Sequence, residues 1–239
     1  MILNNDPLKK YSGILVHPSS LPGGSYCGTF GNAVKEWIEI LSIYKINTWQ
    51  FLPLSPTDSM GSPYSSPSSF ALNPWFLDVN ELIENNYIKD SCQAKNFQLD
   101  AENLNGFQFK VADQLSKIMG NLLIDSWGLQ SFYKKDQFYV WCENNSWVDE
   151  FSVFMTLKEE FAFSAWWNWP EEYKYKNKLA IEKWKKNNVK SILKKKLIQW
   201  HLNRQWLKLK SFAEIKGIRL IGDLPFYVSR DSVDVWSDK

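Results

Sequence analysis

Apolar and polar positions near the N-terminus follow a pattern that predicts a strand, a helix and a second strand. Residues 12–17 form a short apolar run that ends at a proline-containing loop, as a buried strand would. Apolar positions recur at helical spacing over residues 31–45, and residues 48–52 form a second run that a proline ends. Strand, helix and strand in this order predict a right-handed βαβ unit with parallel strands.

Residues 55–74 are rich in Ser and Pro and have almost no periodic pattern. A stretch of about 20 residues without regular structure in a compact domain is usually either functional or disordered. Tyr64, Phe70 and Trp75 lie in or directly after this stretch, and their aromatic side chains favour an ordered loop. A mobile surface loop is the alternative.

The interval from residue 77 to residue 215 shows helical patterns and no strand. Apolar residues at helical spacing mark one helix around residues 111–122 and another around residues 153–161, and a long helix covers residues 192–215. The Trp and Phe residues of this interval are expected to pack between helices rather than to bind a ligand. Residues 217–222 then form a third apolar run, which predicts a third strand.

Asp223 directly follows this third predicted strand. In barrels and doubly wound sheets, the polar residues of the active site lie just beyond the carboxyl ends of parallel strands. Asp223 is therefore a candidate site residue. A role in capping the next helix or turn is the alternative.

The predicted fold class is α/β, and only three strands are found in the 239 residues. Three strands cannot close a barrel, and a parallel sheet needs cover on both faces. A (β/α)8 barrel typically takes about 250 residues, but more than half of this chain is predicted to form helices that do not alternate with strands. The sheet is therefore expected to continue in further sequence, or the chain is a fragment.

The charge balance argues against a dedicated binder of nucleic acid or membrane surfaces. There are 28 Lys+Arg against 26 Asp+Glu, a net charge of +2, and 44% of the residues are hydrophobic. A basic stretch at residues 174–196 is expected to be a solvated helix face, with a basic patch that binds a partner as the alternative. The 13 Trp residues must fill a core or line a surface that binds a flat ligand.

Cysteine and histidine are scarce. Cys27, Cys92 and Cys142 are far apart and form no CxxC pair, which favours a reducing compartment without a disulfide framework. His17 and His201 are the only imidazoles, so a His/Cys zinc site is not expected. The N-terminus lacks a signal-peptide core and no apolar run reaches about 18 residues, so a cytoplasmic protein is expected, with no membrane partner.

Four segments of the chain carry a more specific pattern. They are GILVHPSSLP at residues 13–22, WQFLPLSPT at 49–57 with SPYSSPSSFALNP at 62–74, QWHLNRQW at 199–206, and GIRLIGDLPFYVSRDSVDVW at 217–236. Together, and in this order, they resemble the 4-alpha-glucanotransferase family (amylomaltase, or disproportionating enzyme) of the alpha-amylase clan. The last segment is especially specific, because a strand, Gly-Asp, Pro and an Asp-Ser-x-Asp-Val-Trp tail coincide in it.

The resemblance implies a (β/α)8 TIM barrel with an inserted helical subdomain. Residues 1–76 would form the first βαβ unit and a substrate loop, residues 77–189 a mainly helical insertion, and residues 190–239 a barrel helix, the third strand and the following loop. The implied reaction transfers alpha-1,4-glucan segments between malto-oligosaccharides with retention, without metal or cofactor. Retention requires two carboxylates about 5–5.5 Å apart, one as nucleophile and one as acid/base.

The resemblance also assigns substrate-binding residues. Asp223 matches the aspartate at the end of the third barrel strand, which positions the transferred glucose unit and is not the nucleophile. Tyr64 matches the loop tyrosine near the donor subsites, and Ser62 in the same motif is a further candidate for a sugar contact. Many members carry another tyrosine in a Gly-Tyr-Gly segment of this loop, where this chain has Asp-Ser-Met at residues 58–60. An accessory glucan contact by that tyrosine is not expected here.

The catalytic carboxylates of the family have no counterpart among these residues. The family nucleophile lies in an Arg-x-Asp-His motif, which this chain lacks, and neither His17 nor His201 is followed by Asp. The resemblance places the nucleophile and the acid/base beyond Lys239, and it does not assign those roles to Asp231 or Asp234. The expectation is an N-terminal part of the enzyme that is inactive alone. A non-catalytic glucan-binding fragment and an alpha-glucan hydrolase of the same clan are the alternatives.

Overall fold

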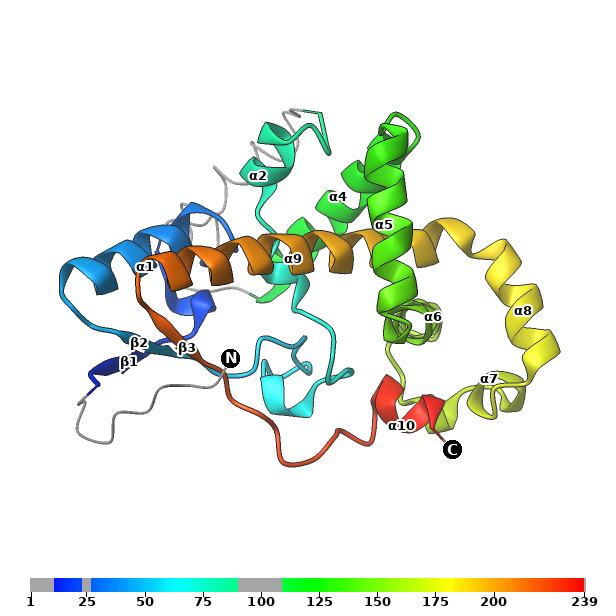
Figure 1. Cartoon of the computed structure of the whole chain (residues 1–239). Coiled ribbons are helices and arrows are strands. Elements are labelled where there is room, and N and C mark those ends of the chain that lie inside the picture. The colour runs from blue at the N-terminus through cyan, green and yellow to red at the C-terminus, as the bar shows by residue number, and fades with distance from the viewer. Residues whose placement is uncertain (1–10, 23–26, 90–108, 239) are drawn as a thin grey trace.

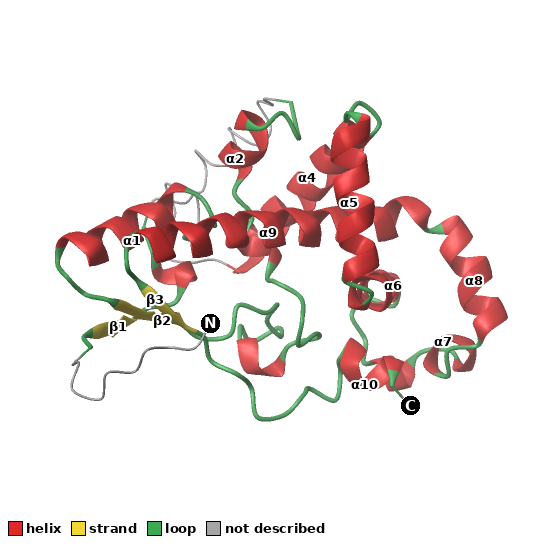
Figure 2. Ribbon diagram, in the orientation of Figure 1, coloured by secondary structure: helices red, strands yellow, loops and turns green. Residues whose placement is uncertain are grey.

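The computed structural model describes residues 11–22, 27–89 and 109–238, which form three strands and a larger number of helices (Figures 1 and 2). The longer helices are α1 (Asn32–Ile43), α4 (Phe109–Trp127), α5 (Phe132–Asn144), α6 (Trp147–Glu160), α8 (Lys178–Asn187) and α9 (Val189–Ile215). The short ones are α2 (Val79–Glu84), α7 (Glu171–Lys174), α10 (Val233–Ser237) and the 3-10 turns η1 (Pro18–Ser20), η2 (Pro63–Ser65), η3 (Pro74–Phe76) and η4 (Trp166–Asn168).

The sheet is parallel, with the strand order β1 (Gly13–Leu15), β2 (Thr48–Gln50) and β3 (Arg219–Ile221). The register places Trp49 of the central strand between Ile14 and Leu220. The predicted βαβ unit and third strand are confirmed. Each strand is shorter than the apolar run that predicted it, because the paired ladder covers only three residues of each run.

Two helices end in the same kind of turn before a strand begins. After α1, the amide of Ile46 donates to the carbonyl of Leu41 (2.9 Å), and after α9 the amide of Ile218 donates to the carbonyl of Ala213 (2.8 Å). These are Schellman contacts, in which the residue past the helix adopts a left-handed conformation. Gly217 does so at φ 71° without a steric penalty. The turns return the chain to the sheet at β2 and β3.

Helix α9 is the central helix of the described structure. It runs from the sheet, where it lies beside α1, to α8 at the opposite side of the view (Figure 1). One hydrophobic cluster joins the sheet to α1, α2, α4, α5 and α9 around Trp49, Leu115 and Leu197. A second cluster joins α6, α8 and α10 around Phe154, Trp184 and other aromatic residues. The described residues of the interval 77–215 contain helices and no strand, as predicted.

Buried tryptophans account for much of the aromatic excess. Trp49 and Trp236 are completely buried. Their indole N–H groups donate to the carbonyls of Val16 (2.8 Å) and Tyr173 (3.0 Å), which removes the cost of burying an unpaired donor. Trp184 likewise donates to Glu160 at 2.6 Å. These residues pack the core, as expected for most of the Trp residues.

Cys27 and Cys142 are free thiols, and Cys92 lies outside the described residues. No helix within the described ranges is both long enough and apolar enough to span a bilayer. Five of the lysines in residues 174–196 form ion pairs with acidic neighbours: Lys176–Glu150, Lys185–Glu182, Lys190–Asp125, Lys195–Glu159 and Lys196–Asp149. This pairing favours the reading of the basic stretch as helix surface.

Candidate substrate-binding site

Tyr64 and Asp223 meet beyond the carboxyl end of the sheet. The Tyr64 hydroxyl donates a hydrogen bond of 2.6 Å to Oδ2 of Asp223, although the two residues are 159 positions apart in the chain. Asp223 follows β3 by two residues, and Tyr64 lies in η2. The structure therefore brings together two of the three site residues that the sequence predicted.

The alternative role of Asp223 as a helix cap does not apply to the next helix. Helix α10 is capped by Ser232, whose hydroxyl accepts a hydrogen bond from the amide of Val235 at 3.3 Å. Asp223 is exposed to solvent apart from its contact with Tyr64. The hydrogen bond to this carboxylate, together with its negative charge, raises the pKa of the Tyr64 hydroxyl above its usual value. Tyr64 therefore keeps its donor proton at neutral pH.

A shallow cavity of about 150 Å³ surrounds this pair. It lies between two arms of the chain, the first over residues 53–72 and the second over residues 223–234, of which residues 223–229 line the cavity. The lining residues are Pro53, Leu54, Ser55, Tyr64, Ser66, Ser69, Phe70, Ala71, Leu72, Asp223, Leu224, Pro225, Tyr227, Val228 and Ser229. Hydroxyl groups, one carboxylate and several aromatic rings thus face one open recess, which is a suitable lining for a sugar.

Ser62 occupies a turn next to this cavity and is not among the residues that line it. Its backbone amide donates to Oδ1 of Asp58 (2.9 Å), and its carbonyl accepts from the amide of Asp58 (3.2 Å). Asp58 also accepts from the amide of Met60 at 2.9 Å. Gly61 has φ 83° within the turn, a conformation that glycine adopts at little cost. The Asp-Ser-Met segment therefore closes a tight turn on an aspartate side chain.

Helix α9 fixes the first arm through a glutamine. The side-chain amide of Gln199 accepts from the backbone N–H of Leu72 (2.9 Å) and donates to its carbonyl (2.8 Å). Gln205 makes the same pair of bonds with Asp78, at 3.0 Å each. Ser66 and Ser68 are buried in the arm. These contacts favour the ordered loop over the mobile one.

The second arm is fixed by a buried lysine of α6. Nζ of Lys158 donates to Oδ2 of Asp231 (2.6 Å) and to the carbonyls of Phe163 and Ser164 (3.2 and 2.9 Å). Oδ1 of Asp231 accepts from the backbone amide of Trp166 at 3.2 Å. Asp231 therefore links the arm that carries Asp223 to the helical layer.

The two arms are also tied to each other. The backbone amide of Ser69 donates to Oδ2 of Asp234 at 2.9 Å, and its hydroxyl lies 3.3 Å from the same oxygen. The amide of Val233 donates to the carbonyl of Pro67 at 2.9 Å. Asp231 and Asp234 thus both make contacts that shape the cavity wall.

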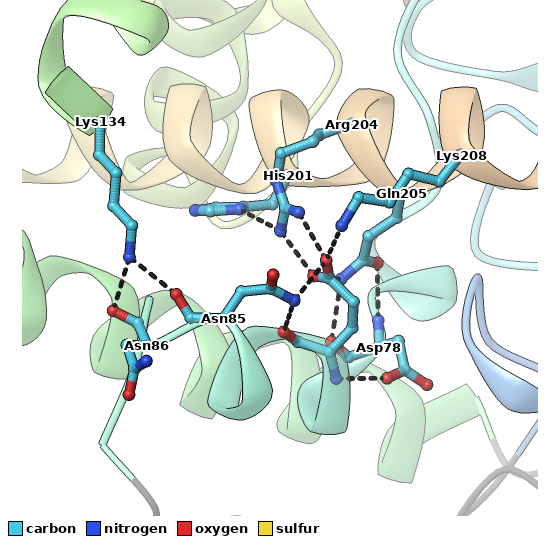
Figure 3. Close-up of polar contacts among 9 residues, drawn as sticks. Asp78, Asn85, Asn86, Lys134, His201, Arg204, Gln205 and Lys208 are labelled. Atoms are coloured by element: carbon cyan, nitrogen blue, oxygen red, sulfur yellow. Dashed lines mark hydrogen bonds and ion pairs between the residues drawn. The ribbon is translucent and has the colours of Figure 1, made fainter.

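A separate polar network joins α2, α5 and α9 (Figure 3). Glu81 accepts two hydrogen bonds of 2.5 Å from Arg204 and one each from Gln205 (3.0 Å) and Lys208 (2.8 Å). Burial raises the pKa of the Glu81 carboxyl, but the bonds from Arg204 and Lys208 outweigh it and lower the pKa to about 2. Lys134 of α5 donates to the carbonyls that follow α2.

His201 is buried beside this network. Its ring lies 4.5 Å from the rings of both Tyr87 and Trp200, and its Nδ1 lies 3.2 Å from a guanidinium nitrogen of Arg204. Burial, and then the positive charge of Arg204, hold the pKa of His201 well below its usual value. His201 is therefore neutral and accepts a hydrogen bond. The segment 199–206 is structural, because Gln199 binds the backbone of the loop at Leu72 and Arg204 binds Glu81 of α2.

A larger cavity of about 730 Å³ lies between the first arm and helices α4, α6 and α9. The Lys195–Glu159 ion pair (2.7 Å) and the hydrogen bond from Trp75 to Asp113 (2.8 Å) lie in its wall. Within residues 11–22, 27–89 and 109–238, no three His, Cys, Asp or Glu side chains are grouped as metal ligands.

Sequence reasoning did not identify the apolar residues around the Tyr64–Asp223 pair. Phe70, Leu224 and Tyr227 line the cavity and are largely exposed, at 64%, 85% and 74%. In the sequence, Phe70 indicates only an ordered loop. The available signal was its position within the same motif as Tyr64, in a loop otherwise rich in serine and proline.

Comparisons with known proteins agree with the motifs. Residues 16–239 match the sequence model of a family described as 4-alpha-glucanotransferase. The 4-alpha-glucanotransferase of Clostridium butyricum is 36% identical over 228 residues, which cover 93% of this chain and 45% of that protein. A 4-alpha-glucanotransferase of Streptococcus pneumoniae serotype 4 is 32% identical over 234 residues, covering 96% and 45%.

A solved structure is similar over nearly all of the chain. Amylomaltase from Streptococcus agalactiae in complex with acarbose superposes with a TM-score of 0.86 at 28% identity, covering 96% of this chain and 46% of that one. The chain thus spans a little under half the length of the relatives it matches. The family match extends over most of the chain and includes both arms of the cavity, and we conclude that this chain belongs to the 4-alpha-glucanotransferase family.

Proposed function

We propose that this chain is the donor-binding part of a 4-alpha-glucanotransferase that transfers alpha-1,4-glucan segments between malto-oligosaccharides with retention at the anomeric carbon. One observation carries the proposal. Tyr64 and Asp223, the two residues that the motifs assign to the donor glucose, share a hydrogen bond in one cavity beyond the carboxyl end of the parallel strands.

In this function the Asp223 carboxylate accepts hydrogen bonds from sugar hydroxyls. Oδ2 already accepts from Tyr64, which leaves Oδ1 and the remaining lone pairs free for the substrate. The ring of Tyr64 covers the apolar face of the pyranose. Contacts of this kind accelerate the reaction only as far as they become stronger in the oxocarbenium-like transition state. Asp223 and Tyr64 are thus binding and positioning residues, and Ser62 is a further sugar contact in the adjoining turn.

Bond cleavage is assigned to other carboxylates. Retaining transfer needs a nucleophile and an acid/base about 5–5.5 Å apart, and the Arg-x-Asp-His motif of the family nucleophile does not occur in residues 1–239. Asp231 and Asp234 are engaged with Lys158 and Ser69. The proposal therefore assigns substrate binding, and not covalent catalysis, to these 239 residues.

The proposed architecture is a (β/α)8 barrel with a helical insertion. The parallel strand order β1-β2-β3 supports this architecture. Parallel strands are usually covered on both faces, whereas Leu15 of β1 and Ile221 of β3 are 57% and 46% exposed here. Residues 1–76 and 190–239 belong to the barrel in this proposal. Residues 77–189 form the insertion.

Incubation with maltotriose tests the activity. The protein that carries this segment is expected to form glucose and longer malto-oligosaccharides, whereas the 239 residues alone are expected to bind maltoheptaose without redistributing it. Formation of shorter sugars alone would favour an alpha-glucan hydrolase of the same clan. Binding without any reaction by the whole protein would favour a non-catalytic glucan-binding role. Redistribution by the 239 residues alone would refute the assignment of catalysis to other carboxylates.

A further inference from the structure

Phe70 presents an aromatic ring at the wall of the cavity that contains Tyr64 and Asp223. Its side chain is 64% exposed, although phenylalanine is among the residues most often buried. It lies six positions after Tyr64 on the same arm of the chain. An exposed aromatic ring beside a polar recess is the arrangement by which a protein binds the apolar face of a sugar while hydroxyl and carboxylate groups bind its edge.

Trp147, the first residue of α6, covers part of this ring from one side. The two rings are nearly parallel, at 23°, and their centroids are 6.1 Å apart. Trp147 itself packs edge-on against Trp141 (6.2 Å) and Phe151 (6.0 Å), so it is held from behind by the helical layer. Trp147 thus lies beside one face of the Phe70 ring, and the rest of the ring is exposed at the cavity.

The backbone that carries Phe70 is fixed as well. The amides of Phe70 and Ala71 both donate to the hydroxyl of Ser68, at 3.2 Å each, and Ser68 is completely buried. Ser69 is bound to Asp234 of α10. A ring held in place before binding loses little conformational entropy when a ligand stacks on it. Phe70 is therefore a rigid platform.

We propose that Phe70, supported by Trp147, is a stacking platform for a glucose unit adjacent to the unit held by Tyr64 and Asp223. The inference rests on the proposed function and deepens it, because it assigns a residue that selects longer donor chains. The occupant is an alpha-1,4-glucan, since the platform is continuous with the cavity of Tyr64 and Asp223 and since consecutive glucose units of such a chain each present an apolar face.

Titration of the 239-residue chain with maltoheptaose and with maltose tests this assignment. Phe70→Ala is expected to weaken maltoheptaose binding about three- to tenfold and to change maltose binding much less, because only the longer chain reaches both positions. Phe70→Tyr and Phe70→Trp keep a flat ring and are expected to restore the affinity. Phe132→Ala is the matched control, since Phe132 is 85% exposed on α5 and does not line the cavity.

The possible results separate this inference from the function on which it rests. Equal maltoheptaose affinity in the wild type and Phe70→Ala would overturn the platform while leaving the proposed function intact. A lower melting temperature of Phe70→Ala with unchanged affinity would show that the ring only packs against Trp147, which also overturns it. Equal losses in Phe70→Ala and Phe132→Ala would do the same. Absence of any maltoheptaose binding by the wild type would overturn both the platform and the donor-binding role.

Discussion

The hydroxyl of Tyr64 donates to the carboxylate of Asp223 across a sequence separation of 159 residues. This contact joins the Ser- and Pro-rich arm that follows β2 to the segment that follows β3. Because the donor and the acceptor both line one cavity, this bond fixes the position of the carboxylate within the cavity.

Tyr64→Phe should weaken binding of maltoheptaose by up to about tenfold, because it removes the donor to Asp223 and keeps the ring. Tyr64→Ala, which also removes the ring, should weaken it further. Isothermal titration calorimetry of both variants measures the difference. Tyr133→Phe, at an exposed position on α5, is the control and should bind like the wild type. Unchanged affinity in Tyr64→Ala would contradict the assignment of Tyr64 to the sugar.

Gln199→Ala should lower the free energy of unfolding by about 2 kcal/mol, because both polar backbone groups of Leu72 lose their partner. It should also weaken maltoheptaose binding, since Leu72 lines the cavity. Gln205→Ala is the matched control, because it releases Asp78, which does not line that cavity. Urea unfolding and calorimetry together test the pair. If Gln205→Ala reduced the affinity as much as Gln199→Ala, the two hydrogen bonds from Gln199 to Leu72 would have no specific role in sugar binding.

Glu81→Gln should destabilise the chain by about 3 kcal/mol, because Arg204 and Lys208, which lower the pKa of Glu81 to about 2, lose the carboxylate charge with which they pair. Glu182→Gln, which removes an exposed partner of Lys185, should cost less than about 1 kcal/mol. The contribution of Glu81 is present above its unfolded pKa near 4.5 and is lost as the pH falls toward 2. Urea unfolding at neutral pH distinguishes the two variants, and similar costs would refute the importance of this network.

The stability of the chain should fall as the pH drops below about 6.5. The pKa of His201 is lower in the folded state than its usual 6.5, so the unfolded state binds more protons and the stability rises with pH. Below 6.5 the loss approaches about 1.4 kcal/mol per pH unit for a histidine that stays neutral when folded. His17, whose pKa burial also lowers, contributes in the same direction. Urea unfolding between pH 7.5 and 5.5 measures the slope.

His201→Gln separates the two histidines. The variant should be less stable than the wild type at pH 7.5, because a packed ring is removed from between Tyr87 and Trp200. Its stability should depend less on pH between 6.5 and 5.5. A slope equal to that of the wild type would show that His201 is not the group responsible.

Much of the framework followed from local patterns. Apolar runs ended by Pro or by Gly-Asp predicted the three strands, and the period of helix α1 was clear. Helix α5 was not recognised, because its aromatic and charged residues do not form one apolar face and only Phe138 is fully buried in it. Helix α9 was predicted over residues 192–215 from its apolar positions, and it begins three residues earlier, at Val189.

The sequence by itself determined the parallel βαβ order, helices α1, α4, α6 and α9, the family, and the choice of Tyr64 and Asp223 as candidate site residues, because strand runs, helical periods and motifs are local properties of the chain. Only the tertiary structure decided that Gln199 and Gln205 hold backbone segments, that Lys158 and Asp231 fix the second arm, and that Phe70 lines the cavity. These relationships depend on hydrogen bonds and ring contacts between residues some 70 to 160 positions apart. No local pattern encodes such pairings, since they arise only when the helices pack against the sheet.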